Sequence, residues 1–221
     1  MKFTVEETWR GGHYEIEMEL GVPSDERLRR ALQRIWSHPS VKGCCFSRDQ
    51  ELQDQVRVNL ENHALESMLF GVTTLPNGAS AACGTFVCRL VGGNDEPPRD
   101  LLSFYVPLGS IARPYAIGGY PDSDVEHAGA WRGQLDPWLA DLGRFVFEAV
   151  EFDLALVGWE VEFPSISAES VKRSGIPAKR YDGYLWRNGK GLDWHPPTSM
   201  ELVRSPGTRK REPFDSGNVH P

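Results

Sequence analysis

The 221-residue chain has few of the features that cross-link small proteins or attach them to a membrane. Four cysteines and the absence of any Asn-x-Ser/Thr sequon argue against a disulfide-rich or glycosylated scaffold. No run approaches the roughly 18 consecutive apolar residues that a membrane helix needs. The opening MKFTVEETWRGG has no apolar segment of a secretory signal. We therefore expect a cytoplasmic protein without a membrane partner.

Positive charge is in deficit, with 24 Lys and Arg against 31 Asp and Glu and a formal net charge of −7. A protein that grips a phosphate backbone normally has the opposite balance, so we do not expect nucleic acid as a partner. The excess of carboxylates either steers a basic protein to the surface or only keeps the surface soluble. Arginine outnumbers lysine 18 to 6, a bias associated with GC-rich bacterial genomes.

Sequence motifs of metal binding and nucleophilic catalysis are missing as well. Cys44 and Cys45 are adjacent, and Cys83 and Cys88 lie five apart on a predicted strand, so neither pair shares a face. The chain contains no His-Glu-x-x-His, no Gly-x-Ser-x-Gly and no phosphate-binding glycine loop. We predict no metal site, no cofactor and no catalytic residue.

One pair of carboxylates is a possible exception to the prediction that the chain has no catalytic residue. Glu160 and Glu162 share a face of a predicted strand over 154–163, where they could act as general acid and base. A solvent-facing polar side of the strand is the simpler explanation. The same interpretation applies to a row of glutamates at 15, 17 and 19, which alternates with apolar residues in a predicted strand over 13–20.

Hydrophobic periodicity predicts an α+β fold with a mostly antiparallel mixed sheet, two main helices and one short helix. The central unit is a helix that Asp136 caps and Pro137 opens, followed by the strand over 154–163. Trp186 and Trp194 are expected to lie near one another across a hairpin. We predict one globular domain over 1–204 and a disordered tail over 205–221. The predicted helices cover 25–38, 137–150 and 168–174, and the other predicted strands cover 41–46, 55–60, 69–75, 79–91, 100–108, 181–187 and 190–194.

The stretch 109–133 is the longest one without a helix or strand pattern. Loops of this length inside a domain tend to be functional, and this one is rich in the Tyr, Trp and Arg side chains that dominate interfaces. We place the partner-binding surface there. The residues proposed to bind the partner are Arg113, Tyr115, Tyr120, His127, Trp131 and Arg132.

These features favour a non-enzymatic protein-binding module that neutralises a protein partner such as a basic toxin. In type, without a shared motif, such a protein resembles the immunity proteins that bacteria make against their own toxins. One alternative is a small hydrolase that combines His127 with Glu160 or Glu162 between the 109–133 loop and the 154–163 strand. Another is a structural, self-assembling component. The oligomeric state and the partner's identity stay open.

Overall fold

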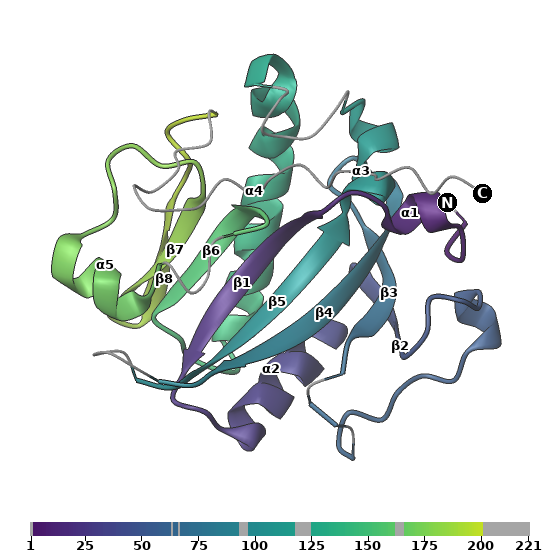
Figure 1. Cartoon of the computed structure of the whole chain (residues 1–221), viewed down its shortest axis with the longest axis horizontal. Coiled ribbons are helices and arrows are strands. Elements are labelled where there is room, and N and C mark those ends of the chain that lie inside the picture. The colour runs from purple at the N-terminus through teal and green to yellow at the C-terminus, as the bar shows by residue number, and fades with distance from the viewer. Residues whose placement is uncertain are drawn as a thin grey trace, which may run out of the picture.

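The computed structural model of the chain is an α+β structure built on one eight-stranded sheet (Figure 1). It describes residues 2–62, 64–65, 67–92, 97–117, 125–161 and 166–200, without the side chains of 125–128. Every strand pairing is antiparallel, so the predicted fold class is confirmed. In sheet order the strands are β2 (Val41–Cys45), β3 (Leu69–Thr74), β4 (Ser80–Leu90), β5 (Arg99–Pro107), β1 (His13–Gly21), β6 (Leu154–Trp159), β7 (Gly183–Asn188) and β8 (Gly191–His195).

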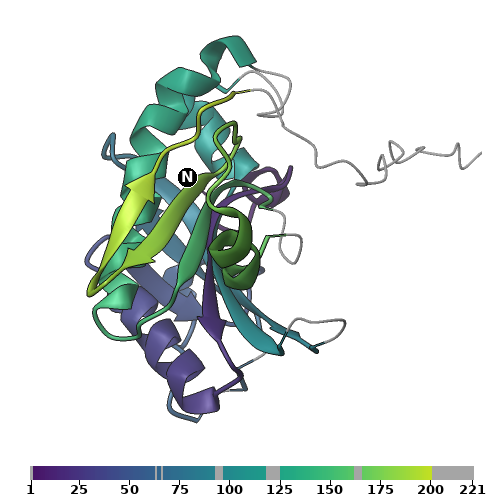
Figure 2. The ribbon, with the colours of Figure 1, turned by 90° about the vertical axis from the view of Figure 1, so that its left-hand side faces the viewer.

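Helices cover both faces of this sheet, but unequally. The larger core lies between one face and the helices α2 and α4, and α5 packs on the opposite face over β6 and β7 (Figure 2). Side chains of β1 alternate between the two faces, so Tyr14, Ile16 and Met18 enter the larger core. The helices are α1 (Glu6–Trp9), α2 (Asp25–Trp36), α3 (Leu108–Tyr115), α4 (Val125–Phe147) and α5 (Ala168–Ser174), with a 3-10 turn over Leu52–Asp54.

Two helix starts follow directly from local sequence. The Ser24 hydroxyl accepts a hydrogen bond from the Arg27 N–H at 3.3 Å and begins α2. The Ser167 hydroxyl accepts one from the Ser170 N–H at 3.1 Å and begins α5. Both caps lie where the Ser residues precede acidic first turns, so the predictions for these helices are confirmed.

The start of α4 differs from the prediction. The helix begins at Val125 rather than Pro137, and α3 occupies Leu108–Tyr115, so much of the predicted 109–133 loop is helical. Pro137 lies inside α4, and the carbonyl that its missing N–H would have bonded belongs to the exposed Gly133. Packing of Leu135 and its neighbours into the core therefore outweighs the weak helix propensity of glycine and proline.

Two strand predictions also change. Residues 55–60 form no strand, although the Val58 N–H donates to the Cys44 carbonyl at 2.8 Å and lies along the edge strand β2. Strand β6 ends at Trp159 because Glu160 adopts a positive φ of 42°. Glu162, the second member of the predicted carboxylate pair, lies outside the described residues.

The C-terminal hairpin is confirmed, but its tryptophans are not neighbours. Trp194 pairs with Leu185, whereas Trp186 pairs with Asp193. Paired residues share a face of the sheet, so the two indoles lie on opposite faces, Trp194 against the larger core and Trp186 against the α5 side. The predicted tail over 205–221 lies outside the described residues. Within the described part of the chain, no helix combines the length and apolarity needed to cross a bilayer.

Candidate functional site

Two of the residues predicted to bind a partner are buried in the core. Trp131 is 2 % exposed and Arg132 is 0 % exposed. The Arg132 Nη2 donates to the Tyr181 carbonyl at 2.6 Å, and its Nε lies 3.6 Å from Asp136 Oδ2. Asp136 also accepts a hydrogen bond from the Tyr14 hydroxyl. In the folded protein these side chains join α4 to β1 and to the segment before β7, and they do not reach a partner.

Asp136 is no helix cap, because α4 begins at Val125 and Asp136 lies in the interior of the helix. Burial raises the pKa of Asp136 to about 6, while Arg132 and the Tyr14 hydroxyl act in the opposite direction. The carboxyl thus belongs to an internal ion pair. The prediction that Asp136 caps a helix and Pro137 opens it is therefore wrong.

Of the other four predicted residues, only Arg113 and Tyr115 have side chains among the described residues. Arg113 is exposed and Tyr115 is half-buried, both on α3. Tyr120 lies outside the described residues. His127 belongs to α4, but its side chain also lies outside the described residues, so its position relative to Glu160 is not defined.

The most unusual polar feature lies instead on β1. Glu15, Glu17 and Glu19 are only 5 %, 5 % and 8 % exposed, so the expected solvent-facing row is in fact buried. All three side chains lie on the face that α5 partly covers, because Glu19 contacts α5 and residues two apart share a face. Burial of ionisable side chains is costly without partners, so each glutamate needs a physical explanation.

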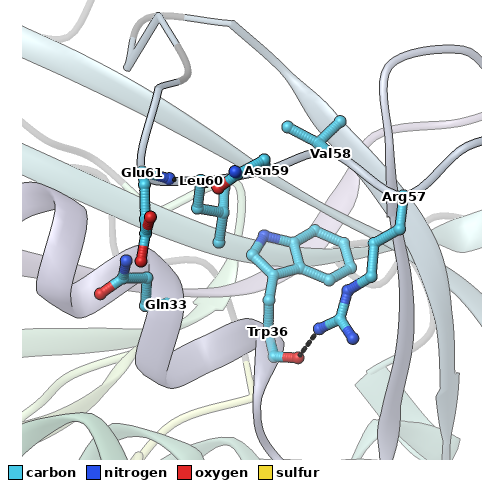
Figure 3. Close-up of a pocket in the computed structure, with 7 residues that line it drawn as sticks. All are labelled: Gln33, Trp36, Arg57, Val58, Asn59, Leu60 and Glu61. Atoms are coloured by element: carbon cyan, nitrogen blue, oxygen red, sulfur yellow. Dashed lines mark hydrogen bonds between the residues drawn. The ribbon is translucent and has the colours of Figure 1, made fainter.

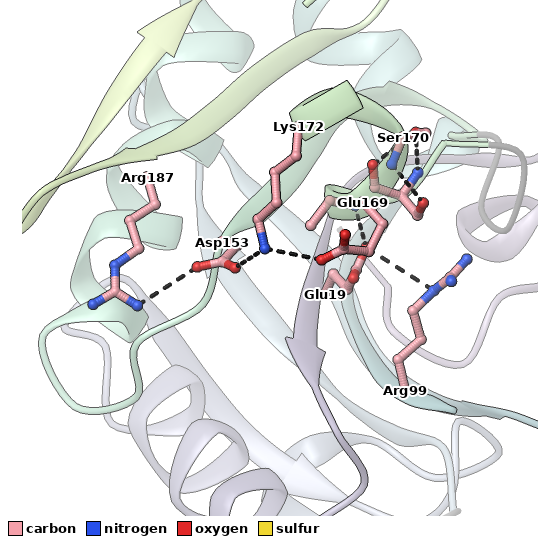
Figure 4. Close-up of polar contacts among 9 residues, drawn as sticks. Glu19, Arg99, Asp153, Glu169, Ser170, Lys172 and Arg187 are labelled. Atoms are coloured by element: carbon pink, nitrogen blue, oxygen red, sulfur yellow. Dashed lines mark hydrogen bonds and ion pairs between the residues drawn. The ribbon is translucent and has the colours of Figure 1, made fainter. Parts of the chain in front are cut away.

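Glu19 has a structural explanation. Its Oε2 accepts a hydrogen bond from the Ala168 N–H at 2.9 Å, in the first turn of α5. The Arg99 Nε of β5 lies 4.0 Å from the same oxygen (Figure 4). Glu19 therefore binds α5 to the sheet, and its charge is compensated from two elements.

Glu17 has weaker compensation. The Ser103 hydroxyl of β5 donates to Glu17 Oε1 at 3.0 Å. Burial raises the pKa of Glu17 to about 7, and the Ser103 hydrogen bond offsets only part of this effect. Near neutral pH this carboxyl is divided between its protonated and ionised forms.

Glu15 is the least compensated of the three. Its Oε1 accepts a hydrogen bond from the Val161 N–H at 3.1 Å, but its buried Oε2 has no hydrogen-bond partner among the residues that the structure describes. Burial, followed by the charge of Glu17, raises the pKa of Glu15 well above its usual range, and Glu160 and Asp182 add to the effect. The charges of three other carboxyl groups thus act on Glu15, and we call Glu15, Glu17, Glu160 and Asp182 the carboxylate cluster.

Glycines make room for two members of the carboxylate cluster. Gly158 is the cross-strand partner of Glu15, and a Cβ at Gly158 would lie only 2.1 Å from Asp182 Oδ1. A Cβ at Gly12 would lie 2.4 Å from Glu160 Oε1. Each carboxylate therefore occupies the space that a side chain would otherwise take. Glu160 in addition adopts the left-handed conformation, which is uncommon for a residue other than glycine and concentrates at functional sites.

Aromatic rings border the carboxylate cluster on β5. The ring of Tyr105, the cross-strand partner of Glu15, packs against the His13 ring at a tilt of 45° with centroids 4.5 Å apart, and its centroid lies 5.8 Å from that of Phe86. His13 is half-buried, and burial lowers its pKa. The neighbourhood thus combines carboxylates with flat apolar surfaces, and aromatic faces attract cations as well.

Two depressions on the surface lie elsewhere. A shallow pocket of about 230 Å³ is found beside α2, where Arg57 donates to the Trp36 carbonyl at 3.1 Å (Figure 3). A second depression of about 280 Å³ adjoins it along Val58 and Asn59. Neither contains a residue of the carboxylate cluster. The first is lined by Gln33, Trp36, Arg57, Val58, Asn59, Leu60 and Glu61.

Comparison with known proteins adds no identification. No protein-family model, curated protein or solved structure matches this chain. Among the described residues, no three His, Cys, Asp or Glu side chains are arranged to hold a metal ion.

The sequence contained a signal for the carboxylate cluster, but its interpretation needed the fold. Period-two alternation correctly placed Glu15, Glu17 and Glu19 on one face of a strand. Whether that face is exposed to solvent depends on segments about 150 residues further along the chain. The contact between Glu19 and Ala168, which are 149 residues apart in sequence, shows this. Glu160 was considered as a catalytic residue, whereas Asp182 was not singled out.

Proposed function

We propose that this protein is a non-enzymatic binding module that neutralises a basic protein partner, and that the face of β1 with the carboxylate cluster receives that partner. The observation that carries the proposal is the pair of buried, incompletely compensated carboxyl groups of Glu15 and Glu17 on β1, the fifth strand of the eight-stranded sheet. A carboxyl that only served solubility would lie in water. Burial without a compensating cation raises the pKa values of Glu15 and Glu17, and a cationic group of a partner close to them would lower these pKa values again.

The charge balance supports the same direction. The chain carries a net charge of −7, which accelerates encounter with a positively charged protein. Glu160 is exposed and its charge raises the pKa of Glu15, so the cluster includes one carboxyl at the surface. Toxin neutralisation by a bacterial immunity-type protein is the specific form of this proposal.

The test is recovery of the partner from the native host. Tagged wild-type protein, purified at low salt and analysed by mass spectrometry and a sizing column, should retain one basic protein in equal proportion. The interaction should weaken as salt is raised, because charge attraction contributes to it. A chain that elutes alone under all these conditions contradicts the proposal.

The hydrolase alternative keeps one observation in its favour. A carboxyl with a pKa near 7, such as Glu17, suits a general acid or base, and Glu15 lies two residues away on the same strand face. An enzyme of this kind would lose its activity in both Glu17→Gln and Glu15→Gln. A panel of ester, peptide and glycoside substrates would test it, with a bell-shaped pH profile as the expected signature.

A further inference from the structure

We propose that the two adjoining depressions beside α2 form a binding site for a short peptide with free termini and an apolar side chain. This inference goes beyond the proposed function and does not rest on it, because no residue of the carboxylate cluster lines either depression. Three features carry it. They are two opposite charges that are not paired with each other, a wall that hydrogen bonds hold in place, and an apolar extension.

The charged side chains of the first depression are Arg57 and Glu61, one of each sign. They lie on opposite sides of the Trp36 indole (Figure 3). Among the described residues neither forms an ion pair, and the hydrogen bond of the Arg57 side chain goes to the Trp36 carbonyl. The guanidinium therefore keeps further N–H donors for a carboxylate, and the Glu61 carboxylate can accept from an ammonium group. A molecule with a carboxylate at one end and an ammonium group at the other matches this arrangement.

Residues 57–61 form one wall of the first depression, and hydrogen bonds hold them in place although they belong to no helix or strand. The Leu60 carbonyl accepts a hydrogen bond from the Arg29 guanidinium of α2. The Glu61 N–H donates to Asn59 Oδ1 at 2.9 Å. A site whose wall is fixed before binding loses less conformational entropy when a ligand binds.

The second depression supplies the apolar extension. It shares Val58 and Asn59 with the first and is also lined by Phe46 and Ala64. Phe46 is 58 % exposed, so an apolar side chain of a ligand can cover it. Together the two depressions, of about 230 and 280 Å³, reach the size of sites that bind small ligands, about 300–1,000 Å³. The charges and the apolar surface thus fit a short peptide better than a purely ionic or purely apolar ligand.

A titration with the dipeptide leucyl-leucine at pH 7 tests the site in the full-length chain. Amide NMR shifts of isotope-labelled protein should saturate at millimolar dipeptide and be largest at residues 46 and 57–62. Arg57→Gln and Glu61→Gln should each weaken binding about fivefold, the upper end of what an exposed ion pair contributes. N-acetyl-leucyl-leucine amide, which lacks both charges, should bind more than tenfold more weakly than the free dipeptide.

The matched controls are Arg173→Gln on α5 and Glu7→Gln on α1. Each removes one charge from an exposed side chain outside the two depressions and should change binding less than twofold. All four substituted side chains are exposed, so the variants keep the fold, and the dispersion of their amide spectra checks this.

Four results would overturn the proposal. The first is the absence of saturable shifts in wild type, and the second is equal binding of the free and the blocked dipeptide. The third is an equal loss in a control variant and in its counterpart in the first depression, which would mean non-specific attraction. The fourth is tighter binding of leucine than of leucyl-leucine, because the two charges of a single amino acid lie closer together than those of the dipeptide, and the site would then be one for a free amino acid.

Discussion

Replacing Glu17 with glutamine should stabilise the protein, and the gain should depend on pH. Glu17 is 5 % exposed and accepts one hydrogen bond, from Ser103. Glutamine keeps the shape and the accepting oxygen but cannot ionise. The variant therefore isolates the cost of a negative charge at this position.

The size of the gain follows from the difference between the two pKa values. Burial raises the pKa of Glu17 from 4.5 to about 7. Because one pKa unit corresponds to about 1.4 kcal/mol, ionising Glu17 in the folded protein at high pH costs about 3 kcal/mol relative to the unfolded chain. The folded form binds the proton more tightly, so this stability is fully present below pH 4.5 and is lost as the pH rises to about 7.

Urea unfolding followed by tryptophan fluorescence, at several values between pH 4 and pH 8, is the appropriate assay. Glu17→Gln and wild type should unfold at similar urea concentrations near pH 4. At pH 8 the variant should be more stable by about 3 kcal/mol, which corresponds to about 10 °C in Tm for a chain of this size. Glu61→Gln, at an exposed carboxyl, should follow wild type throughout. A pH-independent difference, or a less stable Glu17→Gln at pH 8, would refute the reasoning.

Two further substitutions probe the same electrostatics. Ser103→Ala removes the hydrogen bond that lowers the pKa of Glu17. An NMR titration of the Glu17 carboxyl in this variant should therefore give a pKa above that of wild type. An unchanged pKa would mean that Ser103 does not contribute. Arg132→Met leaves Asp136 buried without its cation and should destabilise the protein by about 3–5 kcal/mol at pH 8. The loss should be smaller at pH 5, where the Asp136 carboxyl, with a pKa of about 6, is mostly protonated; urea unfolding at the two pH values measures both.

The sequence was sufficient to predict the helices and strands that interactions between residues close in sequence define. Ser24 and Ser167 cap their helices with their own hydroxyls, so α2 and α5 could be placed within two residues. The alternation over 13–20 likewise sufficed to predict β1. In contrast, the first half of α4 contains Gly129, Gly133 and Pro137, and it becomes helical because its other side chains enter the core.

The candidate site could not be predicted for a related reason. Alternation fixes which side chains share a face, but it does not reveal which distant segment covers that face. Glu15 is buried through contacts with Val161 and with the Asp182 side chain over Gly158, all more than 140 residues away. The aromatic residues of 109–133 led to the opposite error, a predicted surface that is buried. Trp131 is of a residue type that is enriched at interfaces, but its side chain is buried in the core.

The stability cost and the proposed binding site make a joint prediction. A ligand that binds only the folded, ionised cluster stabilises it, by about 2.7 kcal/mol when the ligand is at one hundred times its Kd. This is similar to the cost of about 3 kcal/mol that ionised Glu17 imposes at pH 8. A saturating tri-arginine peptide, acetylated and amidated, which imitates the surface of a basic partner, should therefore raise the Tm of wild type more at pH 8 than at pH 5 and so cancel most of the pH dependence. Glu15→Gln should show a much smaller shift at either pH. An equal shift at both pH values in wild type would mean that the peptide does not bind the ionised carboxylates, and the burial of these glutamates would then need an explanation other than cation recognition.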